Sequence, residues 1–389
     1  MGIVLAWILC GAVGLPAAML ALECLVGARG CRAAGRPDDS PPFTVLMPAH
    51  QEAAGIAAIV KATLSQLRPC DTLLVVADNC TDDTGRIARS LGATVAERHD
   101  PSRRGKGFAL EFGREIIAAD PRFSRAKLIL ILDADCWPEE DALQRLTAAA
   151  AVSGSVIQGA YLLECPPDAS AVVRASCFAF LVKNLVRQLA LRRLTGAALL
   201  QGSGMAFPRA VFLQERWETR SLVEDLELGL RLLLRGIGVG FEPSARFRSA
   251  ASSTAGTEGQ RRRWEHGMLQ VMGRFVPRLL LAGLGGRPRL LVLALDLMVP
   301  PTVLLGALSL GATVIAWVIA WASLPAILLL AVNASLGVAV GVAWWARGRA
   351  ILPPSSLAAM ARYIVWKLPI LLQFVTRRER HWIRTERQS

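Results

Sequence analysis

The stretch KLILILDADC spans residues 127–136 and joins five apolar residues to two acids. A short, continuous apolar run is typical of a strand that is buried on both faces of a sheet. Three similar runs lie upstream: FTVLM (43–47), TLLVVA (72–77) and ATVAE (93–97). Helical patterns follow the first run up to Leu67, the second over 82–91 and the third over 106–118. This alternation predicts an α/β fold with a mostly parallel sheet covered by helices.

Acidic residues follow these strands where each strand ends, in the segments MPAHQE (47–52), VVADNCTDDT (75–84) and ILDADC (131–136). In open α/β sheets, ligands bind beyond the carboxyl ends of the strands. Each acid alone could instead cap the helix that follows it, and we expect this of Asp82 and Asp83. Asp78 lies at the strand end, ahead of the capping position, and is a better candidate for ligand binding.

Asp133 and Asp135 form the sharpest signal. Two carboxylates two residues apart on an extended segment point the same way. Mg²⁺ and Mn²⁺ prefer hard oxygen ligands, and such ions bind through one or two carboxylates together with substrate phosphates. A D-x-D pair also occurs by chance, but its place at a strand end predicts a divalent metal site with Mg²⁺ or Mn²⁺ as cofactor.

Seven blocks of sequence lie between about residues 43 and 270: VLMPAHQEA, VVADNCTDD, RRGKGFAL, LILDADC, LLQGSGMAF, LVEDLELGLRL and QRRRW. In their order and spacing they resemble glycosyltransferase family 2, in the membrane-bound branch that includes cellulose, chitin and hyaluronan synthases and ceramide glucosyltransferases. The resemblance implies a GT-A (Rossmann-like) fold, a nucleotide-sugar donor, expected to be a UDP-sugar, and a reaction that inverts the anomeric centre. Gln51 departs from the Asn usual in the first block.

The resemblance also implies roles in donor binding. Glu52 and Asp78 match residues that hold the uridine ribose and base. Lys106 matches a contact to the nucleotide end of the donor, and the alternative is a surface lysine at a helix N-terminus. Asp133 and Asp135 match the two acids of the D-x-D motif, with Asp135 as the direct metal ligand.

Further blocks match the catalytic and acceptor positions of the family. Glu224 and Asp225 match an E-D motif whose Asp acts as the catalytic base, which takes the proton of the acceptor hydroxyl. Asp225 also opens a periodic helix, where an acid favours the helix dipole without any catalytic role. Gly202 and Ser203 match the segment beside the acceptor, where small residues leave room for a glycan or a lipid head group.

Gln260, Arg263 and Trp264 match a Q-x-x-R-W signature. A guanidinium donates paired hydrogen bonds to phosphate, so Arg263 with Gln260 is suited to hold the leaving diphosphate. Trp264 offers a flat apolar face to an acceptor sugar ring. The alternative is an aromatic residue of a membrane interface beside basic residues.

Apolar residues concentrate near the two ends of the chain. Residues 3–26 are long enough to cross a hydrocarbon core of about 30 Å, and no positive charge precedes them as in a signal peptide. Residues 290–321 and 324–346 predict two more crossings, the first kinked or broken at Pro300–Pro301. Residues 357–375 contain two basic residues and predict an amphipathic helix in the membrane interface.

These features divide the chain into five expected parts. They are an N-terminal transmembrane helix (1–27), a cytosolic GT-A catalytic domain (38–250), the Q-x-x-R-W motif with interface helices (251–286), two transmembrane helices (288–346), and an amphipathic interface helix with a basic tail (355–389).

The net charge of +13 comes almost entirely from arginines, many of which follow the apolar segments. This is the positive-inside pattern, and it predicts an integral protein of the inner or plasma membrane with its catalytic domain in the cytoplasm. No basic helix or RNA-binding motif is present, so nucleic acid is not an expected partner. The eight cysteines contain no C-x-x-C and are typical of scattered thiols in a reducing compartment.

We therefore expect a hexosyltransferase that passes a sugar to a lipid, lipid-linked or glycan acceptor in surface polysaccharide or glycolipid synthesis. Three crossings are few for threading a polymer, which favours single addition. The alternatives are a processive synthase of a β-linked polymer, a catalytically inactive membrane scaffold of the same fold, and a small transporter. A transporter would bury charges within the crossings, where we count only Asp296.

Overall fold

The computed structural model describes residues 1–30, 40–217, 223–251 and 254–359, with the side chains of 254–266, 303 and 357–359 outside the description. The chain forms two compact units. Of the described residues, the first unit contains Met1–Gly30, Cys165–Gly196 and the chain from Ala251 to residue 359. The second unit contains residues 40–164 and Ala197–Ala250.

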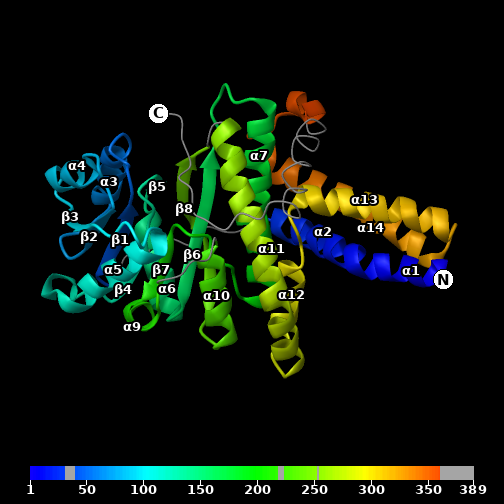
Figure 1. The fold of residues 1–389 in the computed structure, drawn as a ribbon, viewed down its shortest axis with the longest axis horizontal. Helices are drawn as coiled ribbons and strands as arrows, with labels where there is room; N and C mark the ends of the chain where they lie inside the picture. The colour runs from blue at the N-terminus through cyan, green and yellow to red at the C-terminus, as the bar shows by residue number, and fades with distance from the viewer. Residues whose placement is uncertain (31–39, 218–222, 252–253, 360–389) are drawn as a thin grey trace. The chain divides into compact units, whose positions relative to one another are not determined.

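An eight-stranded sheet forms the second unit (Figure 1), in the order β3-β2-β1-β4-β7-β6-β8-β5. Its strands are β1 Phe43–Ala49, β2 Thr72–Asp78, β3 Thr94–Arg98, β4 Leu128–Ile131, β5 Cys136–Pro138, β6 Val156–Glu164, β7 Met205–Pro208 and β8 Val239–Ala250. The four strands predicted from apolar runs are β1 to β4, and they lie side by side at one end of the sheet.

These four strands are parallel, as predicted. The other half of the sheet is mixed, because β7 runs antiparallel to both β4 and β6, and β5 runs antiparallel to β8. Strands β6 and β8 are again parallel. The short strand β7 therefore reverses the direction of the sheet beside β4, which the hydropathy pattern alone did not reveal.

Six helices accompany this sheet: α3 Ile56–Leu64, α4 Thr84–Ser90, α5 Lys106–Ala119, α6 Ala142–Ser153, α9 Arg209–Gln214 and α10 Glu224–Leu234. Helix α5 packs closely on β1, because a Cβ added to Gly113 would lie 2.5 Å from Cδ1 of Leu46. In a parallel sheet the connection from a strand into the next helix lies at the carboxyl edge. Lys106, the first residue of α5, therefore lies at the edge where β1, β2 and β4 end.

The first unit is helical, with α1 Gly2–Leu9, α2 Leu15–Ala28, α7 Ala171–Leu181, α8 Arg187–Thr195, α11 Thr254–Leu284, α12 Arg289–Leu297, α13 Thr302–Ile319 and α14 Leu324–Ala343. The predicted segment 290–321 is broken at Pro300–Pro301 into α12 and α13, as expected of two prolines that cannot donate backbone hydrogen bonds. Residues 165–196, which the sequence analysis included in the catalytic domain, belong to this helical unit.

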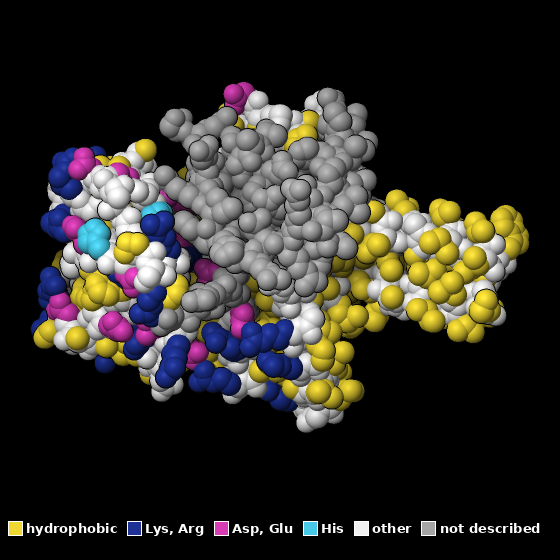
Figure 2. Space-filling view, in the orientation of Figure 1, with side chains coloured by type: hydrophobic (Ala, Val, Ile, Leu, Met, Phe, Trp, Pro, Cys, Tyr) yellow, Lys and Arg dark blue, Asp and Glu magenta, His cyan; other side chains and the backbone are white. Residues whose placement is uncertain are grey.

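Two helices of the described chain are long and apolar enough to cross a membrane, Gly2–Ala28 and Leu324–Gly348, while the apolar helix Leu304–Ile319 is shorter. Small residues fill their shared core, which comprises Ala6, Ala312, Ala316, Ala326 and Leu329. Large apolar side chains point outward instead, and Val318 is 78% exposed. Figure 2 shows these hydrophobic side chains over the bundle of α1, α2, α13 and α14.

A buried ion-pair cluster joins three helices of this unit. The guanidinium of Arg187 donates to Glu23 Oε2 at 2.8 Å and to Asp296 Oδ1 at 2.7 Å. Glu23 and Asp296 are fully buried. The sequence analysis counted only Asp296 as a charged residue in the crossings, and this was wrong, because Glu23 lies inside the first apolar helix.

Residues 360–389 lie outside the described residues, and with them most of the amphipathic helix predicted over 357–375 and the basic tail that follows it.

Candidate functional site

Asp133 and Asp135 lie in the connection between β4 and β5. The backbone N–H of Cys136 donates to the carbonyl oxygen of Asp133 at 3.0 Å, which closes a turn. The prediction of an extended segment was therefore wrong, and Asp at the first position of a turn is a common arrangement. Both acids remain partly exposed at the carboxyl edge of the sheet, so both can still reach a ligand there.

Lys106 reaches into this edge from the N-terminus of α5. Its Nζ lies 2.5 Å from Oδ1 of Asp133 and donates to the carbonyl oxygen of Gly202 at 2.6 Å. Gly105, just before the helix, has a φ of 132°, a conformation that favours glycine. The side chain of Lys106 is only 21% exposed, so it is not a freely solvated surface lysine.

The loop before β7 is tied to the D-x-D turn by side chains. Ser203 Oγ accepts the backbone N–H of Asp133 at 3.1 Å. Behind the loop, the buried side chain of Gln158 accepts from the N–H of Gln201 at 2.8 Å and donates to the carbonyl oxygen of Ser203 at 2.8 Å. These three bonds hold the predicted acceptor segment against the D-x-D turn.

Gly202 lies between the cation and the predicted base. Its φ is 95°, and a Cβ added there would lie 3.3 Å from Oδ2 of Asp225 and 3.6 Å from Nζ of Lys106. A larger residue would be strained and would crowd both groups. The absence of a side chain at Gly202 therefore lets Asp225 and Lys106 approach each other.

Glu224 and Asp225 open helix α10, as the helical periodicity predicted. Burial, together with the neighbouring carboxylate of Asp225, raises the pKa of Glu224 to about 7, although Lys106 acts against this rise. Burial alone would lower the pKa of Lys106, but Asp133, Glu224 and Asp225 outweigh it and raise that pKa. Lys106 is therefore a permanent cation among these carboxylates.

Near the D-x-D turn, the acids of the described residues outnumber the cation of Lys106. One ammonium, that of Lys106, faces the carboxylates of Asp133, Glu224 and Asp225. Within the described residues, no three His, Cys, Asp or Glu side chains gather as a metal site built by protein alone. Excess negative charge from hard oxygen donors fits Mg²⁺ or Mn²⁺ held by one or two carboxylates, Asp133 and Asp135, together with phosphate oxygens of a ligand.

The predicted nucleotide contacts lie further along the same edge. Asp78 is 4% exposed and accepts from Nη1 of Arg98 at 2.6 Å. The guanidinium of Arg98 also lies over the ring of Phe108, 5.7 Å from its centroid. Glu52 follows β1, where its backbone N–H donates to Thr84 Oγ1 at 2.8 Å. Arg98 was missed by the sequence analysis, and it makes Asp78 half of an ion pair.

Asp82 and Asp83 were both predicted to cap the next helix, and only Asp82 makes a hydrogen bond to it. Asp82 Oδ1 accepts the N–H of Thr84, the first residue of α4, at 3.2 Å, and its Oδ2 accepts the N–H of Ala53 at 3.1 Å. Asp83 instead forms an ion pair with Arg86 and makes no capping hydrogen bond. The capping prediction was therefore wrong for Asp83.

Helix α11 contains Gln260, Arg263 and Trp264, and the side chains of these residues lie outside the description. Their contacts to diphosphate and acceptor stay predictions.

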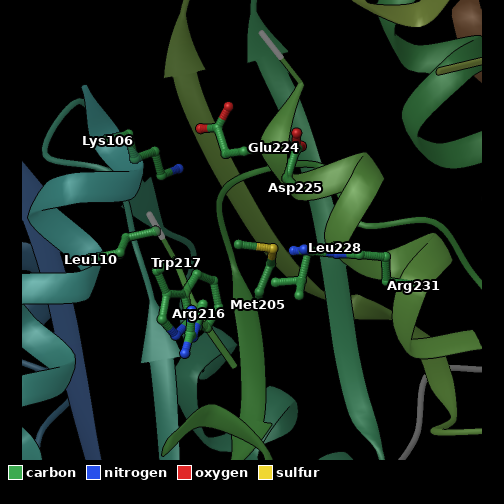
Figure 3. A pocket seen from close by; sticks show the side chains of 9 residues that line it. All are labelled: Lys106, Leu110, Met205, Arg216, Trp217, Glu224, Asp225, Leu228 and Arg231. Atoms are coloured by element: carbon green, nitrogen blue, oxygen red, sulfur yellow. The ribbon is translucent and has the colours of Figure 1, made fainter. Parts of the chain in front are cut away.

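A pocket opens beside Lys106 and the acid pair. It is lined by Lys106, Leu110, Met205, Arg216, Trp217, Glu224, Asp225, Leu228 and Arg231. Figure 3 shows Lys106, Glu224 and Asp225 toward one end and Arg216 with Trp217 toward the other. The sequence analysis singled out neither arginine nor Trp217, although Arg231 shares a helix face with Asp225 and Leu228.

Comparison with known families gives one match across most of the second unit. The family described as "Glycosyltransferase like family 2" matches residues 41–267, which is more than half of the chain. The matched region contains both the D-x-D turn and the acid pair of α10.

Two curated relatives are similar to parts of the chain. The "Probable glycosyltransferase YdaM" of Bacillus subtilis is 27% identical over 255 residues, which cover 61% of this chain and 57% of that protein. The "Low-salt glycan biosynthesis hexosyltransferase Agl6" of Haloferax volcanii is 35% identical over 112 residues, 28% of this chain and 24% of that protein. The match therefore covers less than two thirds of each relative's length.

Among solved structures, the mannosyltransferase PcManGT from Pyrobaculum calidifontis is similar over 95% of this chain and 100% of its own, with a TM-score of 0.54 and 19% identity. That structure is a complex with GDP-Man and Mn²⁺. The likeness confirms the predicted α/β fold of the GT-A type.

Proposed function

This chain belongs to glycosyltransferase-like family 2, and on that premise we propose that it is a metal-dependent, inverting hexosyltransferase. Its donor is a nucleotide-sugar, for which we favour a UDP-sugar. Its acceptor is a hydroxyl group of a lipid or lipid-linked glycan at the membrane surface. The observation that carries the proposal is the convergence of Lys106, Asp133, Gly202 and Asp225 from four separate segments at one edge of the sheet.

In the proposed reaction Asp225 takes the proton of the acceptor hydroxyl. The acceptor oxygen then forms a bond to the anomeric carbon from the face opposite the leaving group, and the bond from that carbon to the diphosphate breaks. The electron pair leaves with the nucleoside diphosphate. Because the two bonds lie on opposite faces, the configuration at the anomeric carbon is inverted.

The leaving diphosphate gains negative charge, and this end of the site carries the charges to receive it. Asp133 and Asp135 would hold Mg²⁺ or Mn²⁺, which when bound supplies positive charge to the phosphates. Lys106 places its ammonium group in the same region. We propose Arg263 and Gln260 as further ligands of the phosphates. Charge stabilisation of this kind acts in the transition state and should appear in kcat.

Glu224 is proposed to assist the base by taking up a proton itself. With its pKa near 7, Glu224 holds a proton for part of the time at neutral pH. A protonated Glu224 places no negative charge beside the carboxylate of Asp225, and Lys106 interacts with both acids. Gly202 and Ser203 line the acceptor side, where Gly202 leaves space next to Asp225.

The catalytic unit is proposed to lie on the cytoplasmic side of an inner or plasma membrane. Support comes from two long apolar helices, Gly2–Ala28 and Leu324–Gly348, and from the outward-facing apolar side chains of the bundle. The last turns of α11 expose Leu281 and Leu284 beside basic residues. We therefore propose that α11 lies at the membrane interface and that its Trp264 receives the acceptor.

The activity is tested by incubating purified protein in detergent with Mn²⁺ and a panel of nucleotide-sugars that includes UDP-hexoses and GDP-mannose, with membrane lipid extract as acceptor. Release of the nucleoside diphosphate and a single mass increment on a lipid support the proposal, and a ladder of masses would indicate a processive synthase. Metal-dependent turnover that survives combined Asp133→Ala and Asp135→Ala substitution would refute the proposed metal site.

The orientation is tested at Cys70, an exposed thiol of the catalytic unit. A membrane-impermeant maleimide should label Cys70 only after the cells are permeabilised, with Cys70→Ser as the control for the other thiols. Labelling of Cys70 in intact cells would place the catalytic unit on the outer side and contradict the proposal.

A further inference from the structure

The pocket beside the acid pair contains two arginines, Arg216 and Arg231, that the proposed reaction does not use. Leu110, Met205, Trp217 and Leu228 form its apolar walls. Arg216 is exposed and Arg231 is partly buried. Together with Lys106 they give the pocket lining three cations against the two acids Glu224 and Asp225. This balance of charge favours an anionic ligand.

Arg231 faces the acid pair along helix α10. Leu228 lies three residues from both Asp225 and Arg231 and so neighbours each of them, and all three residues line the pocket. Six residues of helix put Arg231 about 9 Å from Asp225 along the axis, and helical side chains lean toward the N-terminus. Figure 3 shows the Arg231 side chain reaching from α10 toward Met205, into the pocket.

The side chain of Arg231 is incompletely bonded. Its Nε is buried and has no hydrogen-bond partner among the described residues. Buried donors are nearly always satisfied, and one that is not costs free energy until a partner arrives. A carboxylate or phosphate that entered the pocket would supply the missing acceptor.

Arg216 is held at the pocket by its neighbour Trp217. The backbone N–H of Trp217 donates to Glu111 Oε2 at 2.9 Å, and the indole N–H donates to the carbonyl oxygen of Phe212 at 3.2 Å. Glu111 also acts electrostatically on Arg216, but its Oε1 is bonded to Arg114 and its Oε2 to Trp217. The carboxylate of Glu111 is thus already bonded to other groups, so within the described residues the guanidinium of Arg216 is open to a ligand.

We propose that Arg216 and Arg231 bind an anionic group of the substrate, which makes this enzyme selective for an acidic sugar or an acidic acceptor. This inference rests on the proposed glycosyltransferase function and names its substrate class. The group is a carboxylate or phosphate, carried either by the transferred sugar, as in a hexuronic acid, or by the acceptor near its reactive hydroxyl. Guanidinium groups bind both anions through paired hydrogen bonds.

The donor arm of the test compares UDP-glucuronic acid with UDP-glucose, which differ only in the carboxylate at C6. Binding to the full-length protein with Mn²⁺ is measured by isothermal titration calorimetry. The acceptor arm compares glycerol phosphate with glycerol on the protein saturated with UDP and Mn²⁺. The charged member should bind roughly tenfold or more tightly in one arm, and that arm identifies the source of the anion.

Variants link this preference to the two arginines. Arg216→Leu and Arg231→Leu should each bring the affinity ratio toward one, and Arg231→Lys should retain part of it. Arg122→Leu, at an exposed arginine paired with Asp120, is the matched control and should leave the ratio unchanged. Unchanged affinity for UDP alone shows that each variant is folded and its nucleotide site is intact.

Three results would overturn the inference. One is a ratio near one in both arms of the native protein, and another is a preference that persists when both arginines are replaced by leucine. The third is a loss of UDP affinity in both leucine variants, which would make the arginines ligands of the diphosphate. If native protein fails to bind UDP at all, the proposed function itself fails, and the inference fails with it.

Discussion

The ammonium nitrogen of Lys106 lies 2.5 Å from Oδ1 of Asp133, so a residue at the start of α5 neutralises the first acid of the D-x-D turn. The same nitrogen donates to the carbonyl of Gly202. One cation therefore joins the helix, the turn after β4 and the loop before β7. In the proposed mode of donor binding, Lys106 lies beside the acid that would hold the metal.

Replacement of Lys106 by glutamine should separate metal binding from nucleotide binding. Loss of the ammonium leaves Asp133 without its ion-pair partner, so Mn²⁺ should bind the donor-free protein about tenfold more tightly. UDP should bind the variant more weakly in the presence of Mn²⁺, because a phosphate contact is lost. Electron paramagnetic resonance of free Mn²⁺ measures the first effect and calorimetry the second. Lys61→Gln, at an exposed lysine of α3, is the control, and equal Mn²⁺ affinity in all three proteins would contradict the account.

The raised pKa of Glu224 predicts how stability varies with pH. The carboxyl group of Glu224 has a pKa of about 7 in the folded protein, whereas the ordinary pKa of a glutamate is 4.5. The folded state therefore holds the proton more tightly than the unfolded chain, and stability should fall as the pH rises from about 4.5 to about 7. Glu224→Gln stays uncharged and should lack this fall. Thermal unfolding of both proteins between pH 4 and 8 measures this fall, and parallel curves for the two proteins would count against a raised pKa of Glu224.

Two glycines with nearly equal φ angles provide a matched test of the loop before β7. Gly204 has a φ of 64° and Gly154 a φ of 62°. A Cβ at Gly204 would lie 2.3 Å from Cδ2 of Phe247, whereas a Cβ at Gly154 would meet open space. Gly154→Ala should destabilise by about 1 kcal/mol through backbone strain alone. Gly204→Ala should add about 1–3 kcal/mol from overpacking, and similar losses in chemical unfolding would refute the close packing.

Arg187 should be essential for the stability of the helical unit. Its removal in Arg187→Met leaves Glu23 and Asp296 buried and unpaired, which should destabilise by about 3–5 kcal/mol. The triple variant with Glu23→Gln and Asp296→Asn should recover much of this loss, because no uncompensated charge remains. Thermal unfolding in detergent measures both, with Arg287→Met at an exposed arginine as the control. A single variant as stable as the native protein would show that the cluster contributes little.

The features predictable from sequence were those encoded locally. Apolar runs revealed β1 to β4, and the acids at their ends identified the edge of the sheet where the candidate site lies, as the contact of Lys106 with Asp133 illustrates. Helical periodicity placed Glu224 and Asp225 at the start of α10. These signals need only neighbouring residues, so they can be recognised before the fold is known.

Other features depend on segments that meet only in the folded chain. The D-x-D acids lie in a turn because β5 returns at once to pair with β8, more than 100 residues later in the sequence. The pocket of Arg216 and Arg231 forms where α5, β7 and α10 come together. Glu23 escaped notice because one acid hardly alters the average hydropathy of a long apolar helix, and its partner Arg187 lies 164 residues away.

The central claim is that Asp225 is the base of a sugar transfer from a nucleotide-bound donor. Its most direct test is the Asp225→Asn variant, an isosteric change that removes the negative charge. The account predicts that release of nucleoside diphosphate from the donor falls by roughly a hundredfold or more, while calorimetry finds unchanged binding of the nucleotide with Mn²⁺. Turnover at the native rate by this variant would contradict the claim.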